Sequence, residues 1–235
     1  MNIIYDMWRY ACAASVPDCR KILPESTIIV PMSNSMDSAH IWEDDNRVVL
    51  AFAGTKGTFE DWWQNFQIAP NQDGLHSGFS DAIQNFLPSM ADFLRGAKDE
   101  GKRIYVTGHS QGGAQACVAA YYLHHLKHIS AHHIVSFGAP PFALREDYSV
   151  PVITRVICGN DPVECCFLPS RRAEDRIQLE GTPGGAKFPI LDHDWASYTH
   201  GLMIRASDEK DLDSFYELQK LFECVDHTFT KLEGI

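Results

Sequence analysis

The stretch Lys102–Ala119, which reads KRIYVTGHSQGGAQACVA, decides the fold. It opens with Ile104–Thr107, a short run of apolar, β-branched and aromatic residues that predicts a buried strand. The chain then turns through a Gly-His-Ser-Gln-Gly segment into a run of small residues that predicts a helix. A strand, a G-x-S-x-G turn and a helix in this order form the pattern known as a nucleophile elbow, with Ser110 at its centre.

The two glycines of this turn have a physical reason. A serine that is lifted clear of the sheet needs a strained, tight turn, and a side chain at Gly108 or Gly112 would collide with the neighbouring backbone. The turn also directs backbone N–H groups at the helix N-terminus towards the serine, where an oxyanion would form. Ser110 is therefore the candidate nucleophile. The alternative is an ordinary serine in a glycine-rich turn.

Length and charge limit the possible classes of protein. The chain has 235 residues, of which 45% are hydrophobic, enough to bury one sizeable core, and we expect residues 1–235 to form a single domain. The formal net charge of −11 disfavours binding to nucleic acid. No apolar run is long enough to cross a membrane. The seven cysteines are odd in number and include no C-x-x-C pair, so neither a disulfide framework nor a zinc site is indicated.

The N-terminal stretch MNIIYDMWRYACAASVP carries Asp6 and has no basic start, which is atypical of a signal peptide. We therefore expect a cytoplasmic location, with secretion after removal of a leader as the alternative. Met7, Trp8, Ala11 and Cys12 recur at helical spacing. The same stretch is thus predicted to form an amphipathic helix that packs on the core.

Further short apolar runs alternate with helical patterns along the chain. The runs predicted to form strands are 27–31, 38–42, 48–53, 133–137 and 152–157. The segments predicted to form helices are 80–97, in which Pro88 is expected to introduce a kink, and 212–222. Buried strands that alternate with helices favour an α/β fold, with a mostly parallel central sheet flanked by helices on both faces.

A serine nucleophile needs a base within hydrogen-bond reach and a carboxylate that orients the base. In elbow proteins the chain order is serine, acid, histidine. The acid is expected just beyond the carboxyl end of a later strand, and Asp161 lies there, after the predicted strand 152–157. Pro162 prevents the strand from continuing. Asp147 and Asp175 are the competing acids, on loops that the pattern constrains less.

Two histidines are candidates for the base. His193 lies on a loop before a helix that is predicted to begin at Trp195, whereas His200 would lie one to two turns inside that helix. A base that moves a proton between the serine and the leaving group is better placed on the loop. His193 is therefore preferred, and His200 remains the alternative.

The oxyanion hole needs two preorganised donors. The backbone N–H of Gln111, directly after the serine, is one, and Thr55, after the strand that ends near Ala53, is the second candidate. The alternative for Thr55 is a plain turn residue. The following segment, 58–69, is rich in large aromatic residues, including Trp62, Trp63 and Phe66. It is interpreted either as a lid or acyl-pocket wall, or as a helix that buries these side chains.

No metal or cofactor is expected. Five histidines lie close together in the sequence, but they lack a partner carboxylate at a ligand spacing, which favours a solvated helix end and loop: His124, His125, His128, His132 and His133. The glycine-rich segment Gly181–Gly185 is not followed by G-K-[ST], so it is interpreted as a flexible loop and not as a phosphate site.

Several motifs in this order resemble those of the class 3 lipases, the α/β-hydrolase family of the fungal triacylglycerol lipases and related feruloyl esterases. They are FAGT at 52–55 for F-R-G-[ST], Asp61-Trp62 for the lid D-W, HSGF at 76–79, GHSQGGA at 108–114 for G-H-S-L-G-G-A, FGAP at 137–140 and NDPV at 160–163. The sequence departs from the pattern at Ala53, Leu75 and Gln111. His193 and Tyr198 fit the H-x-x-x-x-Y spacing of the family, and the resemblance implies that the Thr55 hydroxyl also donates to the oxyanion.

The resemblance implies an α/β-hydrolase fold and a lipase-like serine carboxylic-ester hydrolase that needs no cofactor. Its substrate would be an acylglycerol or another fatty-acyl ester, met at a lipid–water interface if the aromatic segment is a lid. The alternatives are a phospholipase A1 or feruloyl-type esterase and, outside enzymes, a silent ligand-binding relative with a damaged triad. The sequence does not predict the acyl chain, the alcohol or the oligomeric state.

Overall fold

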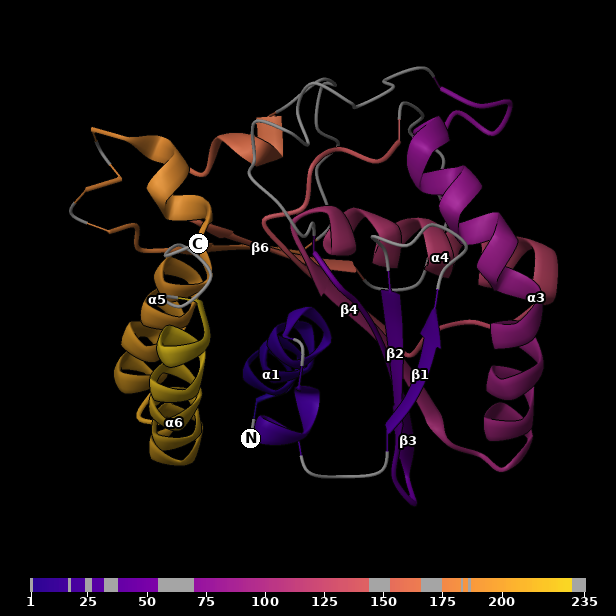
Figure 1. Cartoon of the computed structure of the whole chain (residues 1–235), viewed down its shortest axis with the longest axis horizontal. Helices are drawn as coiled ribbons and strands as arrows, with labels where there is room; N and C mark the ends of the chain where they lie inside the picture. The colour runs from indigo at the N-terminus through magenta and orange to yellow at the C-terminus, as the bar shows by residue number, and fades with distance from the viewer. Residues whose placement is uncertain are drawn as a thin grey trace.

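The computed structural model of the chain describes residues 2–16, 18–23, 27–31, 38–54, 70–143, 153–165, 175–182, 184–185 and 187–229. Within these residues a central sheet lies between two groups of helices (Figure 1). The architecture is that of an α/β-hydrolase, as the alternation of apolar runs and helical patterns predicts.

Seven strands form one sheet in the described part of the chain, and their order in the sheet follows the sequence. They are β1 (Thr27–Pro31), β2 (Ser38–Glu43), β3 (Arg47–Phe52), β4 (Arg103–His109), β5 (His133–Phe137), β6 (Ile153–Cys158) and β7 (Asp175–Leu179). The first two pairings are antiparallel, and β3 to β7 run parallel. The carboxyl ends of the parallel strands therefore meet at one edge of the sheet.

Helices cover the two faces of the sheet. One face carries α3 (Ser77–Asp99) and α4 (Gln111–Lys127), and the other carries α1 (Ile3–Ser15), α5 (Trp195–Asp208) and α6 (Leu212–Phe229). Strand β3 shows why both layers form. Val48, Leu50 and Phe52 point into the α3–α4 core, whereas Val49 and Ala51 point into the core beneath α1. A central strand buried on both faces needs such an uninterrupted apolar run.

The N-terminal helix α1 is tied to the sheet at both of its ends. Near its start, the buried Asp6 pairs with Arg47 at the beginning of β3. At its last residue, the Ser15 hydroxyl accepts a hydrogen bond of 3.0 Å from the backbone N–H of Gly54, beyond the end of β3. Between them Trp8 is fully buried. The predicted amphipathic helix is confirmed. Its contacts reach from the first residue of β3 to just beyond the carboxyl end of that strand.

Some predicted elements differ from the structure. Residues 175–179 form strand β7, which the sequence patterns did not indicate, and Asp175 pairs with Thr154 near the beginning of β6. The expectation that Asp175 lies on a loop was therefore wrong. Helix α3 continues through Pro88. Among the described residues, no helix is both long and apolar enough to span a membrane.

Candidate active site

Ser110 occupies the sharp turn between β4 and α4. Its backbone angles, φ 55° and ψ −126°, are rare for a residue other than glycine and mark a strained turn. A Cβ at Gly108 would lie 2.3 Å from the carbonyl oxygen of Gly112, and a Cβ at Gly112 would lie 2.3 Å from that of Phe52. Both positions thus require glycine because backbone passes close by, which is the reason that the sequence indicated.

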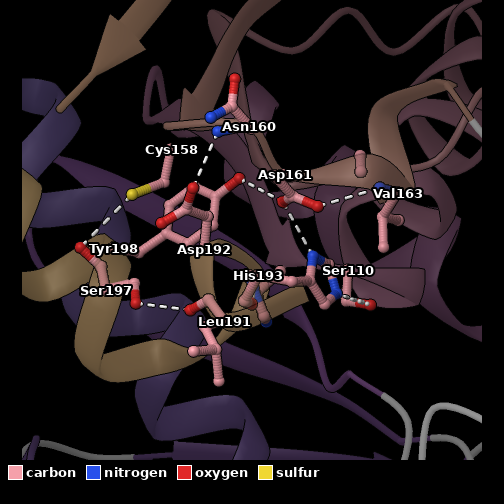
Figure 2. Close-up of polar contacts among 12 residues, drawn as sticks. Ser110, Cys158, Asn160, Asp161, Val163, Leu191, Asp192, His193, Ser197 and Tyr198 are labelled. Carbon is pink, nitrogen blue, oxygen red and sulfur yellow. Dashed lines mark hydrogen bonds and ion pairs between the residues drawn. The ribbon is translucent and has the colours of Figure 1, made fainter. Parts of the chain in front are cut away.

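Three side chains form a continuous hydrogen-bonded chain at this turn (Figure 2). His193 Nε2 lies 2.8 Å from Ser110 Oγ, and His193 Nδ1 lies 2.8 Å from Asp161 Oδ2. An ionised carboxylate only accepts hydrogen bonds, so Nδ1–H donates to Asp161. In the neutral ring Nε2 is then the acceptor, and the Ser110 hydroxyl donates to it. The imidazole is thus held in the tautomer that can take the serine proton.

The fold brings these residues together from positions far apart in the sequence. Ser110 follows β4, and Asp161 follows β6. His193 is the last residue of the short 3₁₀ helix η3 (Pro189–His193), and only Asp194 separates it from α5. The Asp161 side chain is fully buried, and the His193 side chain is 12% exposed. The base is therefore the one member of the acid–base pair that retains access to solvent. His200 lies on α5 as an exposed residue, and the structure does not bring it into this hydrogen-bonded chain.

Asp161 is fixed by two further donors. The Val163 backbone N–H donates to Oδ1 at 2.9 Å, and the Tyr198 hydroxyl donates to Oδ2 at 2.7 Å. Tyr198 is fully buried, and burial, followed by the negative charge of Asp161, raises the pKa of its hydroxyl well above the usual value. The phenol is therefore protonated at neutral pH and donates to the carboxylate. The carboxylate is held on both oxygens and presents a fixed face to His193.

His109 packs against the His193 ring and bonds to its backbone, contacts that the sequence analysis did not predict. Its ring stacks on that of His193, with centroids 4.9 Å apart, and also contacts Trp195 at 4.1 Å. Its Nε2 lies 3.0 Å from the His193 carbonyl oxygen, which can only accept, so Nε2–H donates. Burial lowers the pKa of His109 well below the usual value, and the nearby His193 lowers it further. His109 is thus a neutral donor within the core.

The remaining predicted residues divide into two groups. Gln111 directly follows Ser110 and is the first residue of α4. The first N–H groups of a helix have no partner within the helix, and the helix dipole is positive at this end. Thr55, Trp62, Trp63 and Phe66 lie outside the residues that the structure describes. In the described part of the chain, no group of three or more His, Cys, Asp or Glu side chains could hold a metal ion.

The central half of the chain matches the model of a known protein family. Residues 49–168 match the family model described as "Lipase (class 3)". The chain belongs to the class 3 lipase family. Membership places the chain among the carboxylic ester hydrolases. The matched segment includes Ser110 and Asp161 but ends before His193, so the position of the histidine rests on the geometry above. Among curated proteins, none matches the chain.

Solved structures of fungal lipases share the fold of this chain at low sequence identity. A deletion mutant of Rhizomucor miehei lipase, in its propeptide complex, is 17% identical with a TM-score of 0.58, and the match covers 77% of this chain and 66% of that one. A mutant of MDLA from Penicillium cyclopium is 20% identical, with a TM-score of 0.61 and coverage of 76% and 78%. The mono- and diacylglycerol lipase of Aspergillus oryzae is 17% identical, with a TM-score of 0.54 and coverage of 71% and 74%.

Proposed function

We propose that the chain hydrolyses fatty-acyl esters through an acyl-enzyme formed on Ser110. The observation that carries this proposal is the hydrogen-bonded chain from Ser110 through His193 to Asp161, with both contacts at 2.8 Å. Hydrolysis by a serine nucleophile requires a base within hydrogen-bond reach of the serine and an acid that orients the base. The three residues meet this requirement. A silent ligand-binding relative would not need to maintain it.

In the proposed reaction, Ser110 Oγ attacks the ester carbonyl carbon while His193 Nε2 takes its proton. The tetrahedral intermediate collapses when the imidazolium returns this proton to the alcohol oxygen, and the alcohol leaves. Water then attacks the acyl-enzyme with the same histidine as base, which releases the acid and regenerates the serine. Asp161 stabilises the imidazolium in both halves of the reaction, and Tyr198 and Val163 hold Asp161 in place.

The negative charge on the carbonyl oxygen requires donors that are already in place. The Gln111 N–H at the beginning of α4 is proposed as one donor, and Thr55 as the second. The Ser15 hydroxyl, which accepts from the Gly54 N–H, fixes the backbone one residue before Thr55 and so supports this assignment. The aromatic segment 58–69 is proposed to cover the acyl chain as a lid.

The Aspergillus neighbour is described as a lipase of mono- and diacylglycerols, and an acylglycerol is the substrate class that we propose here. The test compares p-nitrophenyl esters of increasing chain length with a triglyceride emulsion, a phospholipid and a feruloyl ester. Turnover of medium- or long-chain esters and of the emulsion is expected. Preference for the phospholipid would instead indicate a phospholipase A1, and preference for the feruloyl ester a feruloyl-type esterase. Absence of turnover on all of them would contradict the proposal.

A further inference from the structure

Asp192, directly before His193, carries a buried carboxylate that the proposed reaction does not use. The residue is 1% exposed. Its Oδ2 accepts a hydrogen bond of 2.8 Å from the Asn160 backbone N–H, and its Oδ1 accepts from the Thr182 backbone N–H at 2.8 Å and the Thr182 hydroxyl at 3.1 Å. Figure 2 shows the contact between Asp192 and Asn160 beside the Asp161–His193 pair.

The donors come from two separate loops. Asn160 lies in the turn after β6 and is bonded covalently to Asp161, whereas Thr182 lies beyond the end of β7. Asp192 itself belongs to η3 and is bonded covalently to His193. One carboxylate therefore joins the segment that carries the acid of the proposed triad to the segment that carries its base.

The space around this carboxylate is shaped by glycines. A Cβ at Gly159 would lie 2.2 Å from Asp192 Oδ2, and a Cβ at Gly185 would lie 2.0 Å from Oδ1, closer than real Cβ contacts allow. Gly159 also has φ +48°, a conformation that other residues rarely adopt. Both loops must therefore carry glycine at these positions for the Asp192 carboxylate to reach its donors.

The other side of η3 is tied to α5. The Ser197 hydroxyl donates to the Leu191 carbonyl oxygen at 2.6 Å, and the Asp194 carboxylate accepts from the Ser197 backbone N–H at 2.8 Å as the N-cap of α5. His193 thus lies between two anchor points. Asp192 ties the chain before it to the acid loop, and Asp194 ties the chain after it to the helix.

We infer that Asp192 is a positioning residue for the catalytic pair: its carboxylate holds the Asp161 loop against η3 and so sets the contact between Asp161 and His193. This inference rests on the proposed triad. A buried carboxylate has to be compensated by hydrogen bonds, and its three donors supply them. Without the hydrogen bonds of Asp192, the Asp161 loop and η3 are no longer held in a fixed position relative to each other. Small displacements of catalytic groups cost up to about 100-fold in rate.

The test is Asp192→Asn, which keeps the shape of the side chain but places an NH₂ group against N–H donors. We expect kcat on a soluble p-nitrophenyl ester to fall by roughly 10- to 100-fold, with KM within about twofold. The proton NMR resonance of His193 Nδ1–H should move, because it reports the Asp161–His193 hydrogen bond directly. Asp6→Asn is the matched control, since Asp6 is also a buried, paired carboxylate but lies at the other end of the sheet. It should leave kcat and the resonance unchanged.

A second variant disturbs the same carboxylate from the loop that follows β7. Gly185→Ala places a methyl group against Asp192 and should reproduce both effects, and the double variant should be little worse than either single variant. Unchanged kcat per folded molecule and an unchanged resonance in both variants, with only a lower melting temperature, would overturn the inference. Ser110→Ala is measured in parallel. If it stays active, the proposed function fails and this inference with it; if it is inactive while Asp192→Asn keeps its kcat, the positioning role alone fails.

Discussion

The Tyr198 hydroxyl donates a hydrogen bond of 2.7 Å to Asp161 Oδ2, the same oxygen that accepts from His193 Nδ1. A residue on the first turns of α5 thus acts on the carboxylate that follows β6. Because Tyr198 lies on the helix that follows η3 after Asp194, the helix, the base and the acid are held in one hydrogen-bonded unit. This unit is the basis of the first prediction.

Tyr198→Phe removes one donor from the Asp161 carboxylate and leaves the aromatic packing in place. A hydrogen bond to a charged group contributes about 1.5–3 kcal/mol, so we expect kcat to fall roughly tenfold or more, with a smaller change in KM. Steady-state kinetics on a soluble ester measure this. Tyr216→Phe, at an exposed position on α6, is the control. Equal kcat in the two variants would show that Tyr198 only fills space.

The second prediction separates the two histidines. His193→Ala should lower kcat/KM by roughly three to six orders of magnitude, because members of a triad act as one unit. His200→Ala should keep most of the activity, since His200 is exposed on α5 and lies outside the hydrogen-bonded chain. Circular dichroism of both variants checks that they fold. The reverse pattern of activities would remove His193 from the proposed mechanism.

The third prediction concerns stability in acid. His76 is buried, and burial lowers its pKa from the usual 6.5 to about 4. Between these two values the unfolded chain is protonated at this position and the folded protein is not. The free energy of unfolding therefore falls as the pH falls through this window, by up to about 1.4 kcal/mol per pH unit for this histidine. Below the lower value the loss is complete. His109, whose pKa is also lowered by burial, acts in the same direction.

Urea unfolding between about pH 7 and about pH 4.5 measures this dependence. His76→Gln should show a shallower fall of the unfolding free energy across the window, whatever its stability at neutral pH. A fall as steep as that of the wild type would mean that His76 is protonated in the folded protein.

The fourth prediction concerns the aromatic segment 58–69, which lies outside the described residues and remains a hypothesis from the sequence. If its aromatic side chains gate the site, activity on a medium-chain ester should rise steeply once the substrate passes its solubility limit. Exposure of one such side chain costs about 1.5–3 kcal/mol, so a few can shift a closed–open equilibrium by orders of magnitude. Trp63→Ser should reduce the rise and affect soluble esters less. A smooth saturation curve, the same in both proteins, would argue against a lid.

The sequence predicted those features whose determinants are local. The elbow follows from the spacing of Gly108, Ser110 and Gly112, and β3 follows from its uninterrupted apolar run. The position of Asp161 after a strand follows from the rule that sites lie at strand ends. Each of these signals is carried by a few consecutive residues.

The features that were missed depend on distant partners. Strand β7 is an edge strand whose first four residues are not buried, so it has no apolar pattern to detect. Asp192 has the sequence context of an ordinary loop acid, and only the fold brings Asn160 and Thr182 to it. His109 was noted as part of a motif, but its contacts with His193 and Trp195 join segments about eighty residues apart.

The most direct test of the proposed acyl-enzyme is labelling with a p-nitrophenyl phosphonate, which traps an activated serine as a mimic of the tetrahedral intermediate. We predict that the mass of the intact protein rises by a single phosphonyl group, that activity falls in proportion, and that the labelled peptide carries the group on Ser110. Ser110→Ala should take up no label and retain roughly a thousandth to a millionth of the activity. A label on another residue, or activity of Ser110→Ala within about tenfold of the wild type, would contradict the account.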